Sequence, residues 1–359
     1  MANNKQRERS SKSAKPTDSL PTLPLPKKAA ASIRAVTLTD ARKKLPHEFA
    51  RVLKKTLQKI GVDIATDYAH VFAPLKSRFS DEFHEGSVAG GFAHADTILT
   101  SILDNNPTFA ATAPIVLDRF DTQKSELIAS GVLMRIINRT FLLTAAHVTD
   151  HQSEGTLMIP RQQGFMPANG YFSAMRLPAS GHRSDDKLDV AYFWLDDDCV
   201  NDLDSKCRIL ERQDVSLDAE PLRRTTYTFA GFPLRRSRVH GRNIEKDFTT
   251  FSGVEAKNGE YDELGLTRTH HIVMRFHRKQ TFSSRLKKVI VSPLPTGMSG
   301  GGVYAWSEEA MKEWPIRLPL VGIANEFIPD KCLLVATRLH VYVGCISHNQ
   351  PDLAAIAAG

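Results

Sequence analysis

Residues 297–302 read Gly-Met-Ser-Gly-Gly-Gly, a serine within a glycine-rich bend between two stretches that favour β-strands. Glycine lets the chain turn sharply and approach another backbone closely, so N–H groups can point toward a developing negative charge. Taken alone, such a bend most often marks only a tight turn. It becomes informative together with two other segments.

The first of these is Thr144-Ala145-Ala146-His147, at the end of a hairpin predicted from 131–137 and 140–143 with its turn at Asn138-Arg139. The second is Leu188-Asp189-Val190-Ala191-Tyr192-Phe193, an acid at the head of an apolar strand. A lone histidine or a lone turn aspartate usually serves packing or capping. The three segments gain meaning from their combination.

A serine, a histidine and an aspartate on separate loops suit nucleophilic catalysis. A serine hydroxyl is a poor nucleophile until an imidazole takes its proton, and a carboxylate fixes the tautomer of that imidazole and stabilises its charged form. His147, Asp189 and Ser299 lie 42 and 110 residues apart, on different predicted loops. A β scaffold can bring such loops to one site.

From about residue 111 the chain alternates short runs of β-branched and aromatic residues with turn clusters. Few helical periods interrupt these runs, which favours an all-β sandwich or barrel over a βαβ sheet. The predicted strands are Pro114–Leu117, Gly131–Ile137, Phe141–Ala145, Val190–Leu195, Thr225–Phe229, His271–Phe276, Lys288–Val291, Leu320–Ala324 and Leu333–Thr337.

The order Thr-Ala-Ala-His, Asp-Val-Ala, Gly-x-Ser-Gly-Gly resembles the chymotrypsin-like (trypsin-fold) serine peptidases, of the bacterial intracellular type, over about residues 111–345. The resemblance implies two six-stranded antiparallel β-barrels with the site between them. It implies Ser299 as nucleophile, His147 as general base and then acid, and Asp189 as the orienting carboxylate. Ser130-Gly131-Val132, at the start of the first hairpin, also matches.

The same resemblance implies the surroundings of the serine. The N–H groups of Gly297 and Ser299 would form the oxyanion hole. The base of the substrate pocket falls on Pro293, which predicts a small or apolar residue before the cleaved bond rather than a basic one. The predicted substrate-binding residues are Pro293, Ala324, Asn325 and Glu326.

Departures from the secreted members of this family are informative. Val148 and Pro295 stand where those members place cysteines, and Met298 stands where zymogens carry an aspartate that pairs with a newly cleaved N-terminus. We therefore predict that activation does not use that ion pair. A chain with residues 1–110 intact should cleave peptides.

Two alternatives stay open. Residues 297–301 also fit the G-x-S-x-G elbow of α/β-hydrolase esterases, which needs the order serine, acid, histidine; Asp330 and His340 could nominally follow. Gly301-Gly302 makes a poor helix start, which disfavours that fold. A trypsin fold kept as a non-catalytic binding module is the other alternative, although none of the three residues is substituted.

The formal net charge of +7 belongs to the first 46 residues, which hold 11 basic and 3 acidic side chains. We predict a disordered basic tail over 1–46, a helical region over 47–110 and a peptidase domain over 111–350. The tail suggests an acidic partner. It lacks the aromatic residues on which nucleic-acid bases stack, which disfavours nucleic acid.

Composition limits the remaining classes. Among 359 residues no apolar stretch is long enough to predict a membrane span, and no secretory signal is evident. Four cysteines without a C-x-x-C pair suggest neither a disulfide framework nor a zinc site, so we predict a cytoplasmic protein without metal or organic cofactor. An organellar transit peptide is the alternative for the serine-rich, basic N-terminus.

Overall fold

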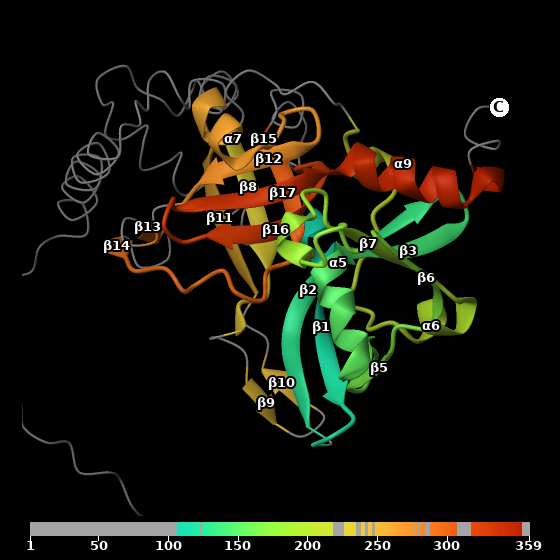
Figure 1. The fold of residues 1–359 in the computed structure, drawn as a ribbon. Helices are drawn as coiled ribbons and strands as arrows, with labels where there is room; N and C mark the ends of the chain where they lie inside the picture. The colour runs from blue at the N-terminus through green and yellow to red at the C-terminus, as the bar shows by residue number, and fades with distance from the viewer. Residues whose placement is uncertain are drawn as a thin grey trace, which may run out of the picture. The chain divides into compact units, whose positions relative to one another are not determined.

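The computed structural model describes residues 106–353, except 123, 218–225, 235–237, 241–242, 246–247, 277, 279–280, 284–287 and 307–316 (Figure 1). The predicted basic tail over 1–46, with its acidic partner, and almost all of the predicted helical region over 47–110 lie outside the described residues. Those predictions remain untested. No helix among the described residues is both long and apolar enough to cross a membrane.

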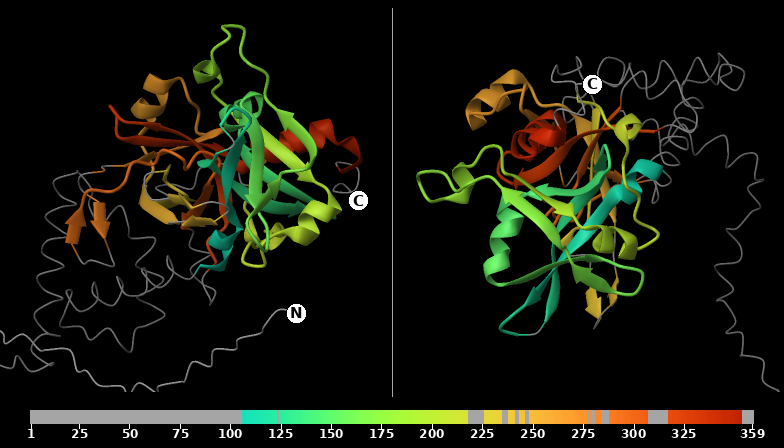
Figure 2. Two further views of the ribbon diagram at one scale, coloured as in Figure 1. Left: turned by 90° about the horizontal axis from the view of Figure 1, so that it is seen from below. Right: turned by 90° about the vertical axis from the view of Figure 1, so that its right-hand side faces the viewer.

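Seven strands form the first antiparallel sheet, in the order β5-β4-β1-β2-β3-β7-β6. Its two outermost strands, β5 and β6, are separated by only two residues in the chain, so the sheet curls until its ends meet (Figure 2). The strands are β1 (Thr112–Arg119), β2 (Ser125–Ile136), β3 (Arg139–Ala145), β4 (Gly155–Pro160), β5 (Phe165–Pro167), β6 (Gly170–Ala174) and β7 (Val190–Leu195).

Six strands form the second antiparallel sheet, in the order β11-β8-β15-β16-β17-β12. A bridge between Glu255 and Met274 joins the ends of β11 and β12, so this sheet also curls on itself. Its strands are β8 (Thr226–Gly231), β11 (Thr249–Val254), β12 (His271–Arg275), β15 (Gly302–Trp306), β16 (Leu320–Ile328) and β17 (Leu333–Arg338).

Short hairpins, helices and 3₁₀ turns complete the described fold. Two further hairpins pair β9 (Arg238–His240) with β10 (Asn243–Glu245) and β13 (Thr281–Ser283) with β14 (Lys288–Ile290). The described α-helices are α5 (Ala146–Thr149), α6 (Asp197–Asp202), α7 (Asn258–Leu264) and α9 (Leu339–Asn349). The 3₁₀ turns are η1 (Pro107–Ala111), η2 (Asp150–Ser153), η3 (Arg183–Asp185) and η4 (Arg212–Asp214).

Two curled antiparallel sheets with few helices confirm the predicted trypsin-like all-β class. Each of the nine predicted strands coincides with an observed strand. The turn of the first hairpin differs, because Ile136 pairs with Arg139 and the two turn residues are therefore Ile137 and Asn138. The exposed Ile137 adopts a left-handed backbone (φ 58°), the conformation that tight two-residue hairpin turns demand.

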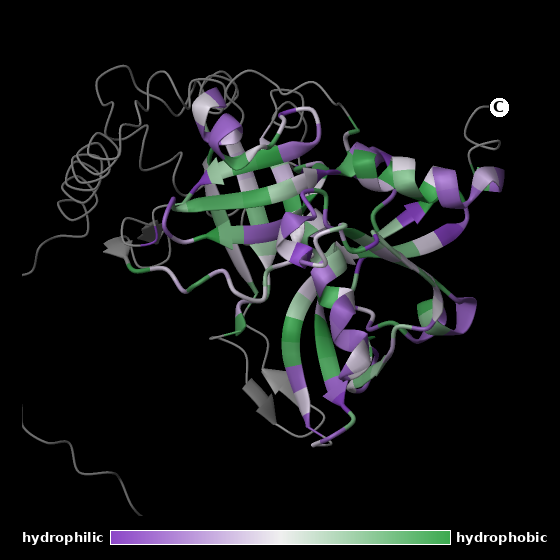
Figure 3. Ribbon diagram, in the orientation of Figure 1, coloured by the Kyte–Doolittle hydropathy of each residue, from purple (hydrophilic) through white to green (hydrophobic). Residues whose placement is uncertain are grey.

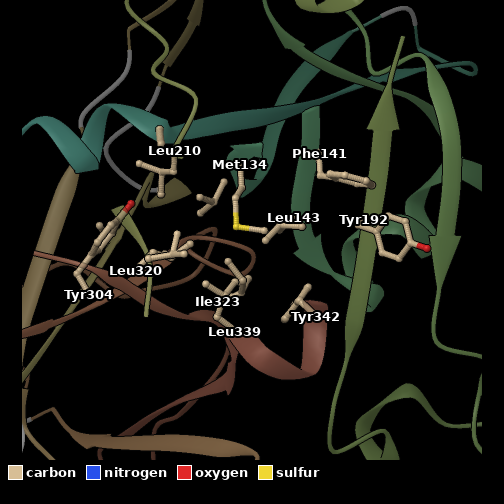
Figure 4. Packing of buried hydrophobic residues seen from close by; sticks show 14 of the residues in the cluster. Met134, Phe141, Leu143, Tyr192, Leu210, Tyr304, Leu320, Ile323, Leu339 and Tyr342 are labelled. Carbon is tan, nitrogen blue, oxygen red and sulfur yellow. The ribbon is translucent and has the colours of Figure 1, made fainter. Parts of the chain in front are cut away.

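The largest group of buried apolar side chains lies between the two sheets (Figure 4). Met134, Leu143 and Tyr192 come from the first sheet, and Leu320 and Ile323 come from the second. Helix α9 adds Leu339, Tyr342 and Ile346 to the same group; hydrophobic colouring alternates with polar colouring along this helix (Figure 3). Burial of this shared apolar surface holds the sheets together.

Candidate active site

His147 lies on the short helix α5, which begins directly after β3. The two preceding alanines are fully buried, and their small side chains allow the chain to turn into the helix against the sheet. The His147 Nδ1 lies 2.6 Å from Asp189 Oδ2, and its backbone N–H donates to Asp189 Oδ1 over 2.9 Å. Because a carboxylate only accepts, the Nδ1 carries the proton and Nε2 is left as the base.

Asp189 adopts a left-handed backbone (φ 49°) immediately before β7. Aspartate tolerates this conformation better than most residues, since its short polar side chain can bond locally. The turn is stabilised by Asp186, whose Oδ1 accepts the N–H groups of Leu188 and Asp189 over 3.2 and 3.1 Å. It is also fixed by Ala146, whose N–H donates to the Asp189 carbonyl over 2.9 Å.

The second sheet holds this turn as well. The Leu188 carbonyl accepts hydrogen bonds from Thr337 Oγ1 (2.6 Å) and from Asn325 Nδ2 (3.2 Å). The imidazole of His271 lies with Nε2 2.9 Å from the Lys187 carbonyl. The carboxylate of the first sheet is therefore positioned by side chains of β12, β16 and β17.

Opposing influences set the pKa of His147. Burial disfavours the imidazolium, but the hydrogen bond and charge of Asp189, with the charge of Asp150, outweigh burial and raise the pKa above its ordinary value of 6.5. Arg183 acts in the opposite direction. A base with a raised pKa is a stronger proton acceptor, but it is neutral only at higher pH.

The bend around Ser299 depends on glycine. Gly297 and Gly300 have φ values of 92° and 82°, which favour residues without a side chain. A Cβ at Gly300 would overlap the Ser130 carbonyl oxygen and Thr144 Oγ1, and one at Gly301 would overlap the Ala230 carbonyl oxygen. The bend is therefore pressed against β2 and β3 on one side and β8 on the other.

Ser130 on β2 connects the bend to the first sheet, a role that the sequence analysis missed. Its N–H donates to the Ser299 carbonyl (2.9 Å), and its fully buried Oγ donates to the Gly297 carbonyl (3.0 Å). The same Oγ accepts the N–H of Phe232 (3.0 Å). The match of Ser130-Gly131-Val132 to the family was the signal for this position, without indicating its contacts.

Met298 is buried, with 2% of its surface exposed, among apolar side chains of the second sheet such as Phe229 and Val303. The bend is thus anchored by apolar packing at this position. The N–H groups of Gly297 and Ser299 have no hydrogen-bond acceptor among the described residues. Two unpaired N–H groups on one sharp bend can bind an oxyanion.

The Ser299 hydroxyl donates to the Asn325 carbonyl over 2.9 Å. Asn325 itself is buried and turns its amide to Leu188 and Thr337, as described above. The structure thus brings His147 and Asp189 into contact and ties the Ser299 bend to the same turn through Asn325. Among the described residues, no hydrogen bond joins the Ser299 hydroxyl to His147.

The remaining predicted substrate-binding residues lie around this bend. Pro293 is half-buried, Ala324 is buried and accepts the Gly300 N–H through its carbonyl (2.6 Å), and Glu326 is exposed. Residues 326–328 of β16 pair with β17 on one side, and no described strand pairs with their other side. An extended peptide could be added at that edge.

Side chains suited to hold a metal ion are not grouped here: the described residues contain no set of three or more His, Cys, Asp or Glu in a suitable arrangement. None of the four cysteines, all of which the structure describes, forms a disulfide. The sequence analysis also missed Arg183 and Asp150, which lie beside the His147–Asp189 pair. Their ion pair spans 33 residues of the chain and leaves no local pattern in the sequence.

No protein-family model and no curated protein matches the sequence. Among solved structures, the chain is similar to neuropsin, a serine protease of mouse brain, with 13% identity and a TM-score of 0.44 over 68% of this chain and 96% of that chain. It is also similar to a Sesbania mosaic virus structure, from work on its VPg protein, with 14% identity and a TM-score of 0.36 over 64% of this chain and 86% of that chain. The protease of tobacco vein mottling virus has 8% identity and a TM-score of 0.36 over 66% of this chain and 81% of that chain. At such values the similarities carry no weight for the chemistry.

Proposed function

We propose that the protein is a serine endopeptidase of the trypsin-like type, with Ser299, His147 and Asp189 as its triad. The observation that carries the proposal is the His147–Asp189 pair, bonded through both carboxylate oxygens and tied through Asn325 to a serine bend whose two N–H groups have no acceptor among the described residues. These are the parts that acyl transfer requires: a base, its orienting acid, a nucleophile and an oxyanion hole.

In this mechanism the Ser299 Oγ attacks the carbonyl carbon of the scissile peptide while His147 Nε2 takes its proton. Asp189 stabilises the imidazolium, and the N–H groups of Gly297 and Ser299 bind the oxyanion. Collapse breaks the C–N bond, and His147 protonates the leaving amine. Water then hydrolyses the acyl-enzyme by the same steps. The open edge of β16 would hold the substrate backbone as an added strand.

The cellular setting belongs to the same proposal. Four cysteines without a disulfide support a reducing compartment, and we infer an intracellular regulatory or processing protease of bacterial type. Pro293, Ala324, Asn325 and Glu326 would surround the substrate side chain before the cleaved bond.

A fluorophosphonate probe tests the chemistry directly, because it reacts with activated serines only. We expect labelling of wild-type protein at Ser299, identified by peptide mass spectrometry, and cleavage of a peptide library. Ser299→Ala should lose both. Absence of labelling in folded wild-type protein would reject the peptidase.

One observation favours a second candidate, a non-catalytic binding module. The Ser299 hydroxyl bonds to the Asn325 carbonyl, so the nucleophile is turned to a backbone acceptor. A binding module would leave the probe unreacted and still bind extended peptides along β16. Retained peptide binding without labelling would select this alternative.

A further inference from the structure

Arg183 joins two segments of the first sheet that carry the proposed base and acid. It lies on η3, between β6 and β7, with only 15% of its side chain exposed. Its Nε and Nη2 donate to the two carboxylate oxygens of Asp150 over 2.9 and 2.8 Å. Its Nη1 donates to Asp186 Oδ2 over 3.0 Å and to the Met175 carbonyl over 2.9 Å.

Both carboxylates are close to the site along the chain. Asp150 begins η2, three residues after His147, and Asp186 stands three residues before Asp189. Asp186 uses its other oxygen to hold the N–H groups that shape the left-handed turn at Asp189. One guanidinium therefore links the end of the histidine segment to the beginning of the aspartate turn.

We propose that Arg183 is a positioning residue of the peptidase: by bonding Asp150 and Asp186 together it holds His147 and Asp189 at hydrogen-bonding distance. Its role in catalysis rests on the proposed function, whereas its effect on the geometry of the pair does not. Arginine suits this role because its planar fork matches a carboxylate through two parallel bonds and still donates elsewhere.

The pKa of His147 provides a readout that separates positioning from a charge effect and from a loss of stability. The charged groups acting on His147 are Asp189, Asp150 and Arg183, and Asp186 pairs with Arg183. The two aspartates that act on His147 raise its pKa and Arg183 lowers it. Arg183→Gln and Asp150→Asn break the same ion pair but remove opposite charges. Through charge alone they would move the pKa of His147 in opposite directions. Loss of the His147–Asp189 hydrogen bond, which raises this pKa more than Arg183 lowers it, would lower the pKa in both.

The experiment compares Arg183→Gln, Asp150→Asn and Arg183→Lys with wild type. Histidine labelled with ¹⁵N gives the pKa of His147 by NMR titration, with the signal assigned by its loss in His147→Gln. The pH profile of kcat/KM gives the same pKa from activity. Arg183→Lys keeps the charge and loses the fork, and circular dichroism checks that each variant is folded.

Because Arg183→Gln and Asp150→Asn both release the His147–Asp189 pair, we expect each to lower the pKa of His147 and to move the acidic limb of kcat/KM to lower pH. Both should lower kcat/KM at the optimum by roughly ten- to a hundredfold, the scale of a misplaced catalytic group. Arg183→Lys, which keeps the charge, should lower kcat/KM and the pKa of His147 in the same way. Arg119→Gln is the matched control: it breaks ion pairs with Glu126 and Glu154 away from His147 and should change neither quantity.

The positioning role is overturned if folded Arg183→Gln and Asp150→Asn shift the pKa of His147 in opposite directions, as charge alone would, or if kcat/KM stays at the wild-type level in both. The outcomes separate this role from the proposed function. An inactive, unlabelled wild type in which both variants still lower the pKa of His147 would reject the peptidase and keep the geometry. An active wild type with opposite or unmoved titrations would reject the role of Arg183 alone.

Discussion

The two halves of the candidate site are held by different kinds of contact. On the side of the first sheet, the acid–base half, His147 with Asp189, is held by charged side chains: Asp186, Arg183 and Asp150. The nucleophile half, residues 297–301, is held by backbone hydrogen bonds, a buried serine hydroxyl and close contacts at glycine. One half is fixed by electrostatics and the other by shape.

This difference predicts that substitutions in the two halves will change different properties of the protein. A changed charge in the acid–base half should alter pH dependence, because the pKa of His147 reflects neighbouring carboxylates and a guanidinium. An added methyl group in the nucleophile half should displace backbone N–H groups without altering that pKa. Substitutions confined to one half can therefore show whether the two halves are independent.

The largest effect is expected from Asp189→Asn in the acid–base half. The amide cannot hold the Nδ1–H tautomer of His147, so kcat should fall by about four orders of magnitude, as in the general logic of the triad. Steady-state peptide hydrolysis measures this loss. Asp185→Asn, at an exposed aspartate on η3, is the control and should retain wild-type kcat. Near-normal turnover of Asp189→Asn would contradict the assignment.

Gly300→Ala tests the nucleophile half. The added Cβ has no room against the Ser130 carbonyl, and φ is 82°, so the bend must shift. We expect kcat to fall by roughly two to three orders of magnitude, the cost of a lost oxyanion donor. The acidic limb of the pH profile should stay in place. In Gly259→Ala on α7, the control, the new methyl group meets no atom within 4 Å.

If Gly300→Ala moved the acidic limb of the pH profile as Arg183→Gln is expected to, the two halves of the site would be coupled, and their proposed independence would be contradicted.

The sequence predicted the strand-rich part of the fold well, for a physical reason. The predicted strands are runs of β-branched and aromatic residues, and those whose burial is described, such as β3 and β17, are largely buried. Of the strands that escaped prediction, β6 is mostly exposed and β11 is only partly buried, whereas β15 is buried but short and begins within the glycine-rich stretch. Helix α9 also escaped, since its β-branched residues favour strands. It is helical because Leu339, Tyr342 and Ile346 share one face buried between the sheets.

Sequence and structure differ likewise at the site. Ser299, His147 and Asp189 could be selected because their motifs are local and ordered along the chain. The contacts of Arg183 and Ser130 could not, since their partners lie 33 and 167 residues away and depend on how the sheets curl. Motifs thus indicate candidate groups for the reaction, whereas only the fold shows what holds them.

Ser130→Ala should give a smaller effect in the nucleophile half. It removes the bond to the Gly297 carbonyl and leaves the buried Phe232 N–H without its acceptor, costing about 1–3 kcal/mol of unfolding free energy. We expect kcat to fall by roughly ten- to a hundredfold, because the oxyanion bend loses one of its two bonds to Ser130. Urea denaturation and peptide hydrolysis measure both quantities.

Ser252→Ala serves as control for this variant. It also loses one hydroxyl hydrogen bond, that to Thr228 on β8, but has no contact with the bend. If Ser252→Ala loses as much stability as Ser130→Ala but keeps wild-type kcat, the loss of kcat in Ser130→Ala results from its contact with the bend. Wild-type kcat in Ser130→Ala itself would show that glycine packing alone shapes the oxyanion bend.

The smallest effect concerns His271, where the second sheet reaches the acid–base half. Burial lowers the pKa of His271, with His270 and Arg338 acting in the same direction. Since its folded-state pKa lies below the unfolded value, its contribution to stability is present above the unfolded pKa of about 6.5 and is lost as pH falls through the folded pKa. The neutral ring donates from Nε2 to the Lys187 carbonyl and accepts the Thr267 N–H at Nδ1.

His271→Gln retains a hydrogen-bond donor for the Lys187 carbonyl but cannot titrate, so it removes only the effect of protonating this side chain. We expect the free energy of unfolding, measured with urea, to fall less in this variant than in wild type as the pH is lowered from 7.5 to about 5. Because the Leu188 carbonyl is also held by Thr337 and Asn325, kcat near neutral pH should change little. A large loss of kcat in His271→Gln would mean that the acid–base half depends on the second sheet as much as on its own charges, and the contrast between the two halves would need to be redrawn.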